Sequence, residues 1–179
     1  MIYENARQKS RQALRETMLG LMRTKPIRSI TVTELCRACR LNRSTFYAHY
    51  DTVEHLLDDL YSGLFRDMGA YLQLRPHQQR ITDEDVFTDF LVHTCQQDNR
   101  FMLFLRSDDA LRFERNMIIH FLNRQYPQGA SMADQYDLLY HIGGAFTLVC
   151  TWIREGYPCP PRDLARRIIS LTRTGGLDA

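Results

Sequence analysis

Apolar side chains recur along this chain at the three- and four-residue spacing of α-helices, and no segment shows the alternation of a half-buried strand. Leu14, Met18 and Met22 form one such stripe, which predicts a first helix over about residues 5–24 that stops before Pro26. The same spacing predicts a short helix after residue 42, one from about residue 82, and others over about 31–39, 51–74, 100–106, 108–126, 131–156 and 161–174. We therefore predict an all-α fold of about nine helices.

Helix starts in the first third of the chain are marked by capping residues. In Thr31-x-x-Glu34 the threonine hydroxyl is expected to accept from the backbone N–H of Glu34, whose carboxylate returns the bond. Asp51-x-x-Glu54 has the same spacing, and Asn42 is the expected N-cap of the short helix. Two short helices, a tight turn and a long exit helix make a helix-turn-helix unit, braced by the first helix. Its predicted core is Ile30, Val32, Leu35, Leu41, Phe46 and Tyr50.

The segment NRSTFYAHYDT, residues 42–52, combines buried-type and hydrogen-bonding side chains. Phe46 and Tyr50 lie four residues apart and are expected to face inward. Arginine suits paired hydrogen bonds to guanine, hydroxyls reach bases or phosphates, and tyrosine and histidine suit phosphate oxygens. Thr52, at the start of the next helix, adds backbone N–H groups directed at phosphate. The surface predicted to enter a DNA major groove carries Arg43, Ser44, Thr45, Tyr47 and His49.

Charge is distributed unevenly along the chain. The formal net charge is +2, but residues 1–50 hold ten Lys or Arg against three Glu, a net charge of +7. The remainder holds 13 basic and 18 acidic side chains, a net charge of −5. A basic end on an acidic body suits a polyanionic partner at that end. A solvated basic face without a partner explains the charge equally well.

The run ITVTELCRACRLNRSTFYAHYDTVEHLL resembles the DNA-binding signature of TetR-type transcriptional regulators, over about residues 27–57. The resemblance implies a helix-turn-helix domain over residues 1–50 and a helical effector-binding and dimerisation domain over residues 51–179. It implies that Thr31 caps its helix near phosphate, that Thr33 points toward base edges, and that double-stranded DNA is the partner. The full predicted DNA-binding set is Thr31, Thr33, Asn42, Arg43, Ser44, Thr45, Tyr47, His49 and Thr52.

Three features depart from that signature. Arg40 stands where glycine is usual, so either the turn has a positive φ at a cost of about 1 kcal/mol or it takes another shape. Val53 replaces a lysine and removes one expected phosphate contact. Cys36 and Cys39 replace alanines. Their spacing is that of a zinc ligand pair, but no second Cys or His pair follows, so we predict small core side chains and no metal or other cofactor.

The last two predicted helices carry enough apolar surface to pair with a second chain. Glycines permit close backbone approach, and Leu164, Ile168 and Leu171 form a stripe. We predict a homodimer through a four-helix bundle, with burial inside one chain as the alternative. This region also resembles the TetR subgroup that includes activators of dihydroxyacetone kinase operons. The predicted interface is Gly143, Gly144, Phe146, Cys150, Ile153, Leu164, Ile168 and Leu171.

Aromatic, methionine and histidine side chains lie between the two ends, and in this family such residues often line an effector pocket. The same spacing is more often plain core, and single histidines on apolar helices are more often structural. The candidate lining of a small-molecule effector site is Phe90, His93, Phe101, Phe104, Phe113, Met117 and Tyr140.

The sequence thus predicts a homodimeric regulator, a repressor acting at a pseudo-palindromic operator and gated by an effector. The alternative is a DNA-tethered coactivator whose C-terminal domain binds a partner protein. Nothing indicates an enzyme: the chain has no Gly-rich phosphate loop, HExxH or GxSxG motif. Five cysteines at irregular spacing, no secretory signal and a longest apolar run of residues 140–153 predict a cytoplasmic protein with no membrane partner.

Overall fold

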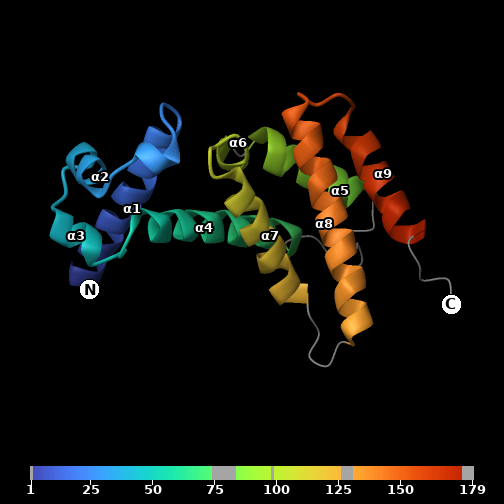
Figure 1. Cartoon of the computed structure of the whole chain (residues 1–179), viewed down its shortest axis with the longest axis horizontal. Helices are drawn as coiled ribbons and strands as arrows, with labels where there is room; N and C mark the ends of the chain where they lie inside the picture. Colours follow the sequence, from blue (N-terminus) through green and yellow to red (C-terminus); the bar gives the residue numbers. More distant parts are fainter. Residues whose placement is uncertain (1, 74–83, 98, 126–130, 175–179) are drawn as a thin grey trace.

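The computed structural model describes residues 2–73, 84–97, 99–125 and 131–174 of the chain (Figure 1). Every regular element in these ranges is helical, and they contain no strand, so the all-α prediction is confirmed. A 3-10 turn, η1, follows the first helix, and a π-helical segment, η2, follows the fifth. The elements are α1 (Ile2–Met22), η1 (Ile27–Ser29), α2 (Val32–Ala38), α3 (Arg43–Tyr47), α4 (Val53–Gln73), α5 (Glu84–Leu91), η2 (Val92–Gln97), α6 (Asn99–Leu105), α7 (Ala110–Gln125), α8 (Met132–Arg154) and α9 (Pro161–Thr174).

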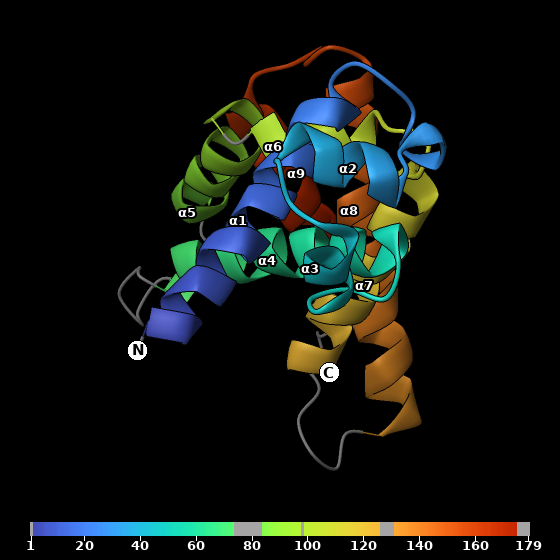
Figure 2. The same cartoon turned by 90° about the vertical axis from the view of Figure 1, so that its left-hand side faces the viewer.

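The first three helices and η1 form a head at one end of the molecule (Figures 1 and 2). Leu14 and Met18 of α1 are fully buried against α2 and α3. From the predicted core of this unit, Ile30, Leu35, Phe46 and Tyr50 are buried, while Val32 and Leu41 are partly buried against them. The head is therefore a small helix-turn-helix unit built on α1, as the sequence predicts.

The long helix α4 leaves the head and runs into a body made of α5 to α9 with η2 (Figure 1). Its buried apolar positions recur every three or four residues from Leu56 to Met68, which places one continuous apolar face along that part of the helix. Toward the head this face packs into the same core as α1, and toward the body it packs against α7. The buried residues of α4 are Leu56, Leu57, Leu60, Tyr61, Leu64, Phe65 and Met68.

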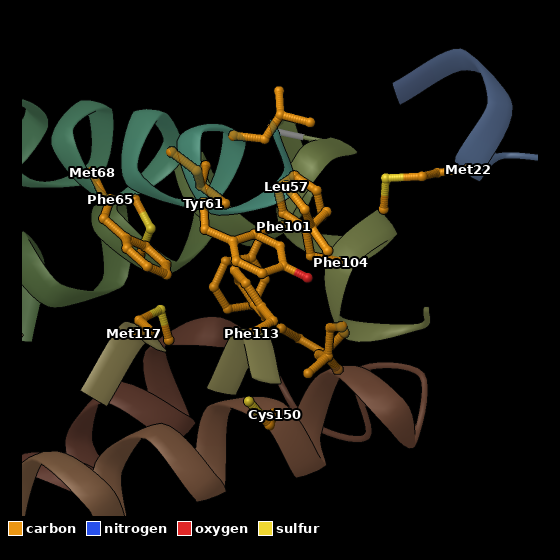
Figure 3. Close-up of a cluster of buried hydrophobic side chains, with 14 of the residues drawn as sticks. Met22, Leu57, Tyr61, Phe65, Met68, Phe101, Phe104, Phe113, Met117 and Cys150 are labelled. Atoms are coloured by element: carbon orange, nitrogen blue, oxygen red, sulfur yellow. The ribbon is translucent and has the colours of Figure 1, made fainter. Parts of the chain in front are cut away.

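An aromatic cluster joins α4 to α6 and α7 (Figure 3). Phe113 lies at its centre, with ring centroids 5.2 Å from Tyr61, 5.7 Å from Phe65, and 5.4 Å from both Phe101 and Phe104. Tyr61 and Phe104 meet edge to face at 4.7 Å. Aromatic pairs in this range add to the stabilisation from buried area, so the cluster is the main junction between α4 and the body.

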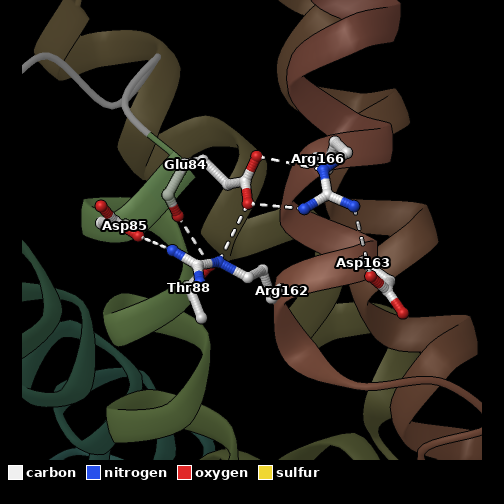
Figure 4. Close-up of polar contacts among 6 residues, drawn as sticks. All are labelled: Glu84, Asp85, Thr88, Arg162, Asp163 and Arg166. Carbon is white, nitrogen blue, oxygen red and sulfur yellow. Dashed lines mark hydrogen bonds and ion pairs between the residues drawn. The ribbon is translucent and has the colours of Figure 1, made fainter.

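Ion pairs to α5 and a hydrogen-bonded turn after α8 hold α9 in place. Arg166 makes paired hydrogen bonds of 3.0 and 3.1 Å to Glu84, and Arg162 lies 2.9 Å from the same carboxylate, which ties α9 to α5 (Figure 4). At the end of α8 the chain turns through Gly156 and Tyr157, both with positive φ. The Tyr157 N–H bonds back to the Trp152 carbonyl at 2.9 Å, and the Trp152 indole donates to Cys159 at 2.7 Å.

Candidate nucleic-acid interface

The start of α2 is capped as predicted, but only in one direction. Thr31 Oγ1 accepts from the backbone N–H of Glu34 at 3.2 Å. The carboxylate of Glu34 instead pairs with Lys25 Nζ at 2.6 Å, which ties α2 to the segment that follows α1. Thr31 and Thr33 are both exposed at this end of the helix, so both side chains are open to contact from outside the protein.

The turn between α2 and α3 has a positive φ of 56° at Arg40. The Leu41 N–H bonds to the Cys36 carbonyl at 2.9 Å and the Arg40 N–H to the Arg37 carbonyl at 3.3 Å, which is the Schellman pattern of helix ends. Arginine thus occupies a conformation that glycine adopts without strain. The first of the two expectations for this turn, a positive φ at Arg40, is therefore confirmed.

Helix α3 presents a polar face on an apolar anchor. Phe46 is fully buried, whereas Tyr47 beside it is 49% exposed. Arg43 and Ser44 are exposed and Thr45 is half-buried. Asn42 occupies the N-cap position, but its side chain makes no capping bond, and its carbonyl accepts from Thr45 and Phe46. The N-cap position predicted for Asn42 is therefore confirmed, but its side chain makes no capping bond and Asn42 is exposed.

Arg43 rests on Tyr47. Its guanidinium lies 6.0 Å from the centre of the Tyr47 ring, and Nη2 donates to the tyrosine hydroxyl at 3.4 Å. That hydrogen bond raises the pKa of Arg43 further, so its charge is permanent. The pair places a cation and a phenol side by side on the exposed face of α3.

His49 follows α3 and bonds to α1. Its Nε2 lies 2.8 Å from Oγ of Ser10, and that hydroxyl in turn donates to the Arg7 carbonyl at 2.9 Å. Burial, together with the charges of Arg7 and Arg11, lowers the pKa of His49 from its ordinary value near 6.5. The imidazole is therefore neutral at physiological pH.

The long helix α4 begins at Val53, two residues after the predicted start at residue 51. Oγ1 of Thr52, not the side chain of Asp51, accepts from the backbone N–H of His55 at 3.2 Å. Asp51 pairs with His55 at 3.3 Å instead. Glu54 bonds to its own backbone N–H and to Thr52, and these bonds lower its pKa. The exposed start of α4 therefore carries Thr52, as the DNA-binding set requires, but also two carboxylates.

A partly buried ionic clamp, which sequence reasoning did not find, holds α1 against α4. Asp59 accepts from Arg11 at 2.6 Å, from Arg15 at 2.7 Å and from the Tyr50 hydroxyl at 2.7 Å. Burial raises the pKa of Tyr50 to about 12, with the Asp59 bond as the next cause, so the phenol stays protonated. Gly63 leaves room for Arg15, because a Cβ there would lie 2.5 Å from the guanidinium.

A second connection joins the head to the loop between α6 and α7. The carboxylate of Asp108 accepts from the backbone N–H of Ile27 at 2.7 Å and of Arg28 at 3.4 Å. A carboxylate from the body thus caps the first turn of η1 in the head. No local sequence signal marks this bond, because its partners lie about eighty positions apart.

The effector-pocket candidates do not converge on one cavity. Phe101, Phe104 and Phe113 are almost fully buried in the aromatic cluster, and Met117 is 4% exposed (Figure 3). Phe90 stacks on Phe87 at 6.0 Å, His93 is half-buried on η2, and Tyr140 is 74% exposed on α8. The structure therefore brings four of the seven together as packed core, the outcome that the sequence favoured over a pocket.

The dimer candidates divide between the core and the surface. Five of them are less than 10% exposed inside the single chain: Phe146, Cys150, Ile153, Leu164 and Ile168. Gly144 and Leu171 lie on the exposed side, with Gly143 half-buried beside them. Helical periodicity identified apolar positions on these helices, but it could not decide which face the body itself covers. Large exposed apolar side chains that sequence reasoning missed on α8 are Met132, Tyr136 and Leu139.

Other chemistries find no support in the described ranges. No three His, Cys, Asp or Glu side chains there lie close enough to hold a metal ion, and Cys36 and Cys39 are free thiols that donate to backbone carbonyls. Burial raises the pKa of Cys36. None of the described helices is long and apolar enough to cross a membrane.

The fold is a helix-turn-helix head carried by one long helix on an all-helical body. No protein-family model and no curated protein matches the sequence. Solved structures match the fold over nearly the whole chain. A TetR transcriptional regulator from Streptococcus agalactiae 2603V superposes with a TM-score of 0.69 and 21% identity, covering 96% of this chain and 98% of that one.

Two further structures extend this likeness. The fatty acid degradation regulator FadR from Bacillus halodurans has a TM-score of 0.57 and 13% identity, covering 94% of this chain and 96% of its own. The dihydroxyacetone kinase operon activator DhaS has a TM-score of 0.52 and 12% identity, covering 92% and 94%. This chain therefore has the fold of TetR-type transcriptional regulators.

Proposed function

We propose that this protein is a sequence-specific DNA-binding regulator of transcription, in which α3 enters the major groove. The observation that carries the proposal is the polar face of α3: Arg43, Ser44 and Tyr47 stand exposed on a helix anchored by fully buried Phe46. Arg43 is placed to contact a guanine edge, and the hydroxyls and Tyr47 to contact bases and phosphates. Its structural neighbours are regulators rather than enzymes, which supports the same function.

The experiment that tests this proposal is selection from sheared genomic DNA at about 0.15 M salt, where non-specific binding is weakened. Bound fragments are sequenced, and enrichment of one motif is the expected result. Folded protein that enriches no motif and binds no duplex would overturn the proposal.

The proposal includes a homodimer, formed through the exposed side of α8 and α9. Tyr136 is 62% exposed, Tyr140 74% and Leu171 42%, and a contiguous exposed apolar patch marks an interaction site on a protein surface. Tyr140, Gly144 and Leu171 line a crevice of about 530 Å³ between the two helices. Two heads held about 34 Å apart would suit a pseudo-palindromic operator.

Repression gated by a small molecule is the regulatory form we propose. An open groove of about 760 Å³ between α4 and α7 is the candidate effector surface, because it is lined by the groups that bond the two helices together. Asp58 accepts from Arg112 at 2.7 Å, and Tyr61 donates to Asp109 at 3.3 Å.

Transcription in vitro from a promoter carrying the selected motif should fall when the protein is added; a rise would identify an activator.

The second candidate is a coactivator that binds a protein partner through its body. The packing of Phe101, Phe104 and Phe113 into a filled core favours it over a ligand held inside the body. An experiment with cell extract distinguishes the two candidate functions. The extract is split by size, and each fraction is added to the protein–DNA complex. Release by the small-molecule fraction supports an effector, whereas a change caused only by the protein fraction supports a coactivator.

A further inference from the structure

An open crevice of about 420 Å³ lies between α1 and α3. Polar side chains line it from both helices and from the segment that follows α3: Arg7, Ser10, Ser44, Thr45 and His49. Ala6 and Ala48 complete the lining, and their small side chains leave the crevice open. It adjoins the exposed face of α3, so a ligand that contacts that face would also meet α1.

The hydrogen bonds in the crevice fix the state of His49. Because the Ser10 hydroxyl donates to the Arg7 carbonyl at 2.9 Å, its oxygen is free to accept from His49 Nε2 at 2.8 Å. The neutral imidazole therefore carries its proton on Nε2, and a second proton can be added only at Nδ1. Ser10 thus orients the ring and selects its tautomer.

The charges at the crevice are positive. Arg7 is exposed and lines the crevice. Arg11 acts on His49 from the next turn of α1, while its own guanidinium is bonded to Asp59 and Tyr50. The neighbouring ring of Tyr50 stays neutral. The described lining offers one guanidinium, three hydroxyls and an imidazole, and none of these described residues is a carboxylate, which suits an anion.

We propose that this crevice holds a phosphate of the DNA backbone, with Arg7 supplying the charge and Ser10 positioning His49. The inference rests on the proposed function and extends its contact surface from α3 to α1, since neither Arg7 nor Ser10 belongs to the set predicted from the sequence. A phosphate held here would fix the register of α3 in the groove without selecting a base sequence.

A phosphate held in the crevice should cause the imidazole of His49 to take up a proton. Arg7 and Arg11 disfavour the charged imidazole in the free protein, and a phosphate beside them offsets that effect. The pKa of His49 is therefore higher in the complex than in the free protein. Because the complex then binds more protons, affinity is greatest at low pH and falls as pH rises through the two pKa values. A rise of about 1 corresponds to about tenfold in affinity for each head.

The first experiment compares variants in their binding to one duplex over a range of salt. Arg7→Ala should lower the slope of log affinity against log salt by about 0.9 for each head. Ala48→Leu fills the crevice without changing charge and should weaken all duplexes several-fold. Arg23→Ala is the matched control, since it removes the same charge from the far end of α1 and does not line the crevice. Equal behaviour of Arg7→Ala and Arg23→Ala would overturn the proposal.

The second experiment follows the imidazole of His49 by NMR as a function of pH. The pKa should rise by about 1 on adding the selected duplex, and a smaller rise with inorganic phosphate would show binding of the free anion at the same site. Ser10→Ala should abolish the preference for the Nε2–H tautomer, and His55→Gln controls for the other histidine near the DNA. If wild-type protein binds no duplex, the proposed function fails; if it binds duplex while His49 is unchanged, only this inference fails.

Discussion

The proposed recognition residues on α3 owe their position to their buried neighbours. Phe46 is fully buried and meets Tyr47 edge to face at 5.5 Å, so the turn of helix that carries Arg43 and Tyr47 cannot rotate freely. To contact a base as proposed, Arg43 would give up its hydrogen bond to Tyr47. Both side chains are exposed to water in the free protein. Such an exchange costs little, because exposed charge contacts contribute little to stability.

Arg40→Gly is expected to stabilise the protein by about 1 kcal/mol, because glycine adopts the positive φ of this turn without strain. The free energy of unfolding, measured by urea denaturation, checks the change. Arg37→Gly, three residues earlier inside α2, is the matched control and should destabilise by about 1 kcal/mol. Equal effects of the two substitutions would contradict the role given to this turn.

At the scale of elements, α4 is bonded to both its neighbours by charged groups. Asp59 ties it to α1, while Asp58 and Tyr61 tie it to α7. Asp108 joins the α6–α7 loop directly to η1 of the head. The body is therefore bonded to the head along two routes, through α4 and through Asp108.

Loss of the Asp59 carboxylate should destabilise the protein by about 2–3 kcal/mol at neutral pH, because Asp59→Ala leaves Arg15 and Tyr50 without their buried partner. Burial would raise the pKa of Asp59, but bonds from Tyr50 and Arg11 and the charge of Arg15 lower it below its ordinary 3.8. A carboxyl with a lowered pKa in the folded state stabilises above the unfolded value and loses that contribution as pH falls below about 4.

Chemical denaturation between about pH 2 and pH 7 checks how the free energy of unfolding depends on pH. The wild type should lose stability more steeply than Asp59→Asn at the acid end. Asp51→Asn removes an exposed carboxylate at the start of α4 and should change stability by less than about 0.5 kcal/mol. A wild-type profile parallel to that of Asp59→Asn would contradict the clamp.

Asp108→Ala should loosen the first turn of η1, because it removes the acceptor of the Ile27 and Arg28 backbone N–H groups. The expected cost is about 1 kcal/mol, as for loss of a helix cap. Amide hydrogen exchange should show faster exchange at Ile27, while the Leu35 amide inside α2 keeps its protection. Unchanged exchange at Ile27 would show that water replaces this bond without cost.

The sequence was most informative where signals are local. Thr31 and the buried pair Phe46 and Tyr50 are found by spacing alone, because caps and helical faces depend on residues three or four apart. The Asp59 clamp and the Asp108 cap join residues far apart in the chain, and no local pattern encodes them. The sequence did not show which side of α8 faces the core, because apolar positions surround this helix. Only the packed body shows that Phe146 and Ile153 face inward.

At the scale of the whole molecule, the proposed dimer depends on the surface of α8 that one chain leaves open. Tyr140→Asp places a charge in that surface, and sedimentation should show the mass of one chain, 21.1 kDa, where the wild type shows twice that mass. Leu111→Asp is the matched control, since Leu111 is 81% exposed on α7 and lies outside α8 and α9. A monomeric wild type, or a dimer unaffected by Tyr140→Asp, would contradict this interface.

The central claim is that the exposed face of α3 selects the DNA sequence. The most direct test repeats the genomic selection with Arg43→Ala and Tyr47→Phe beside the wild type and compares the base frequencies at each motif position. Arg43→Ala should lose preference at one position of each half-site, at a cost of about 1–3 kcal/mol, whereas Tyr47→Phe should weaken binding evenly and keep the motif. An unchanged motif and affinity with Arg43→Ala would show that α3 does not carry the recognition.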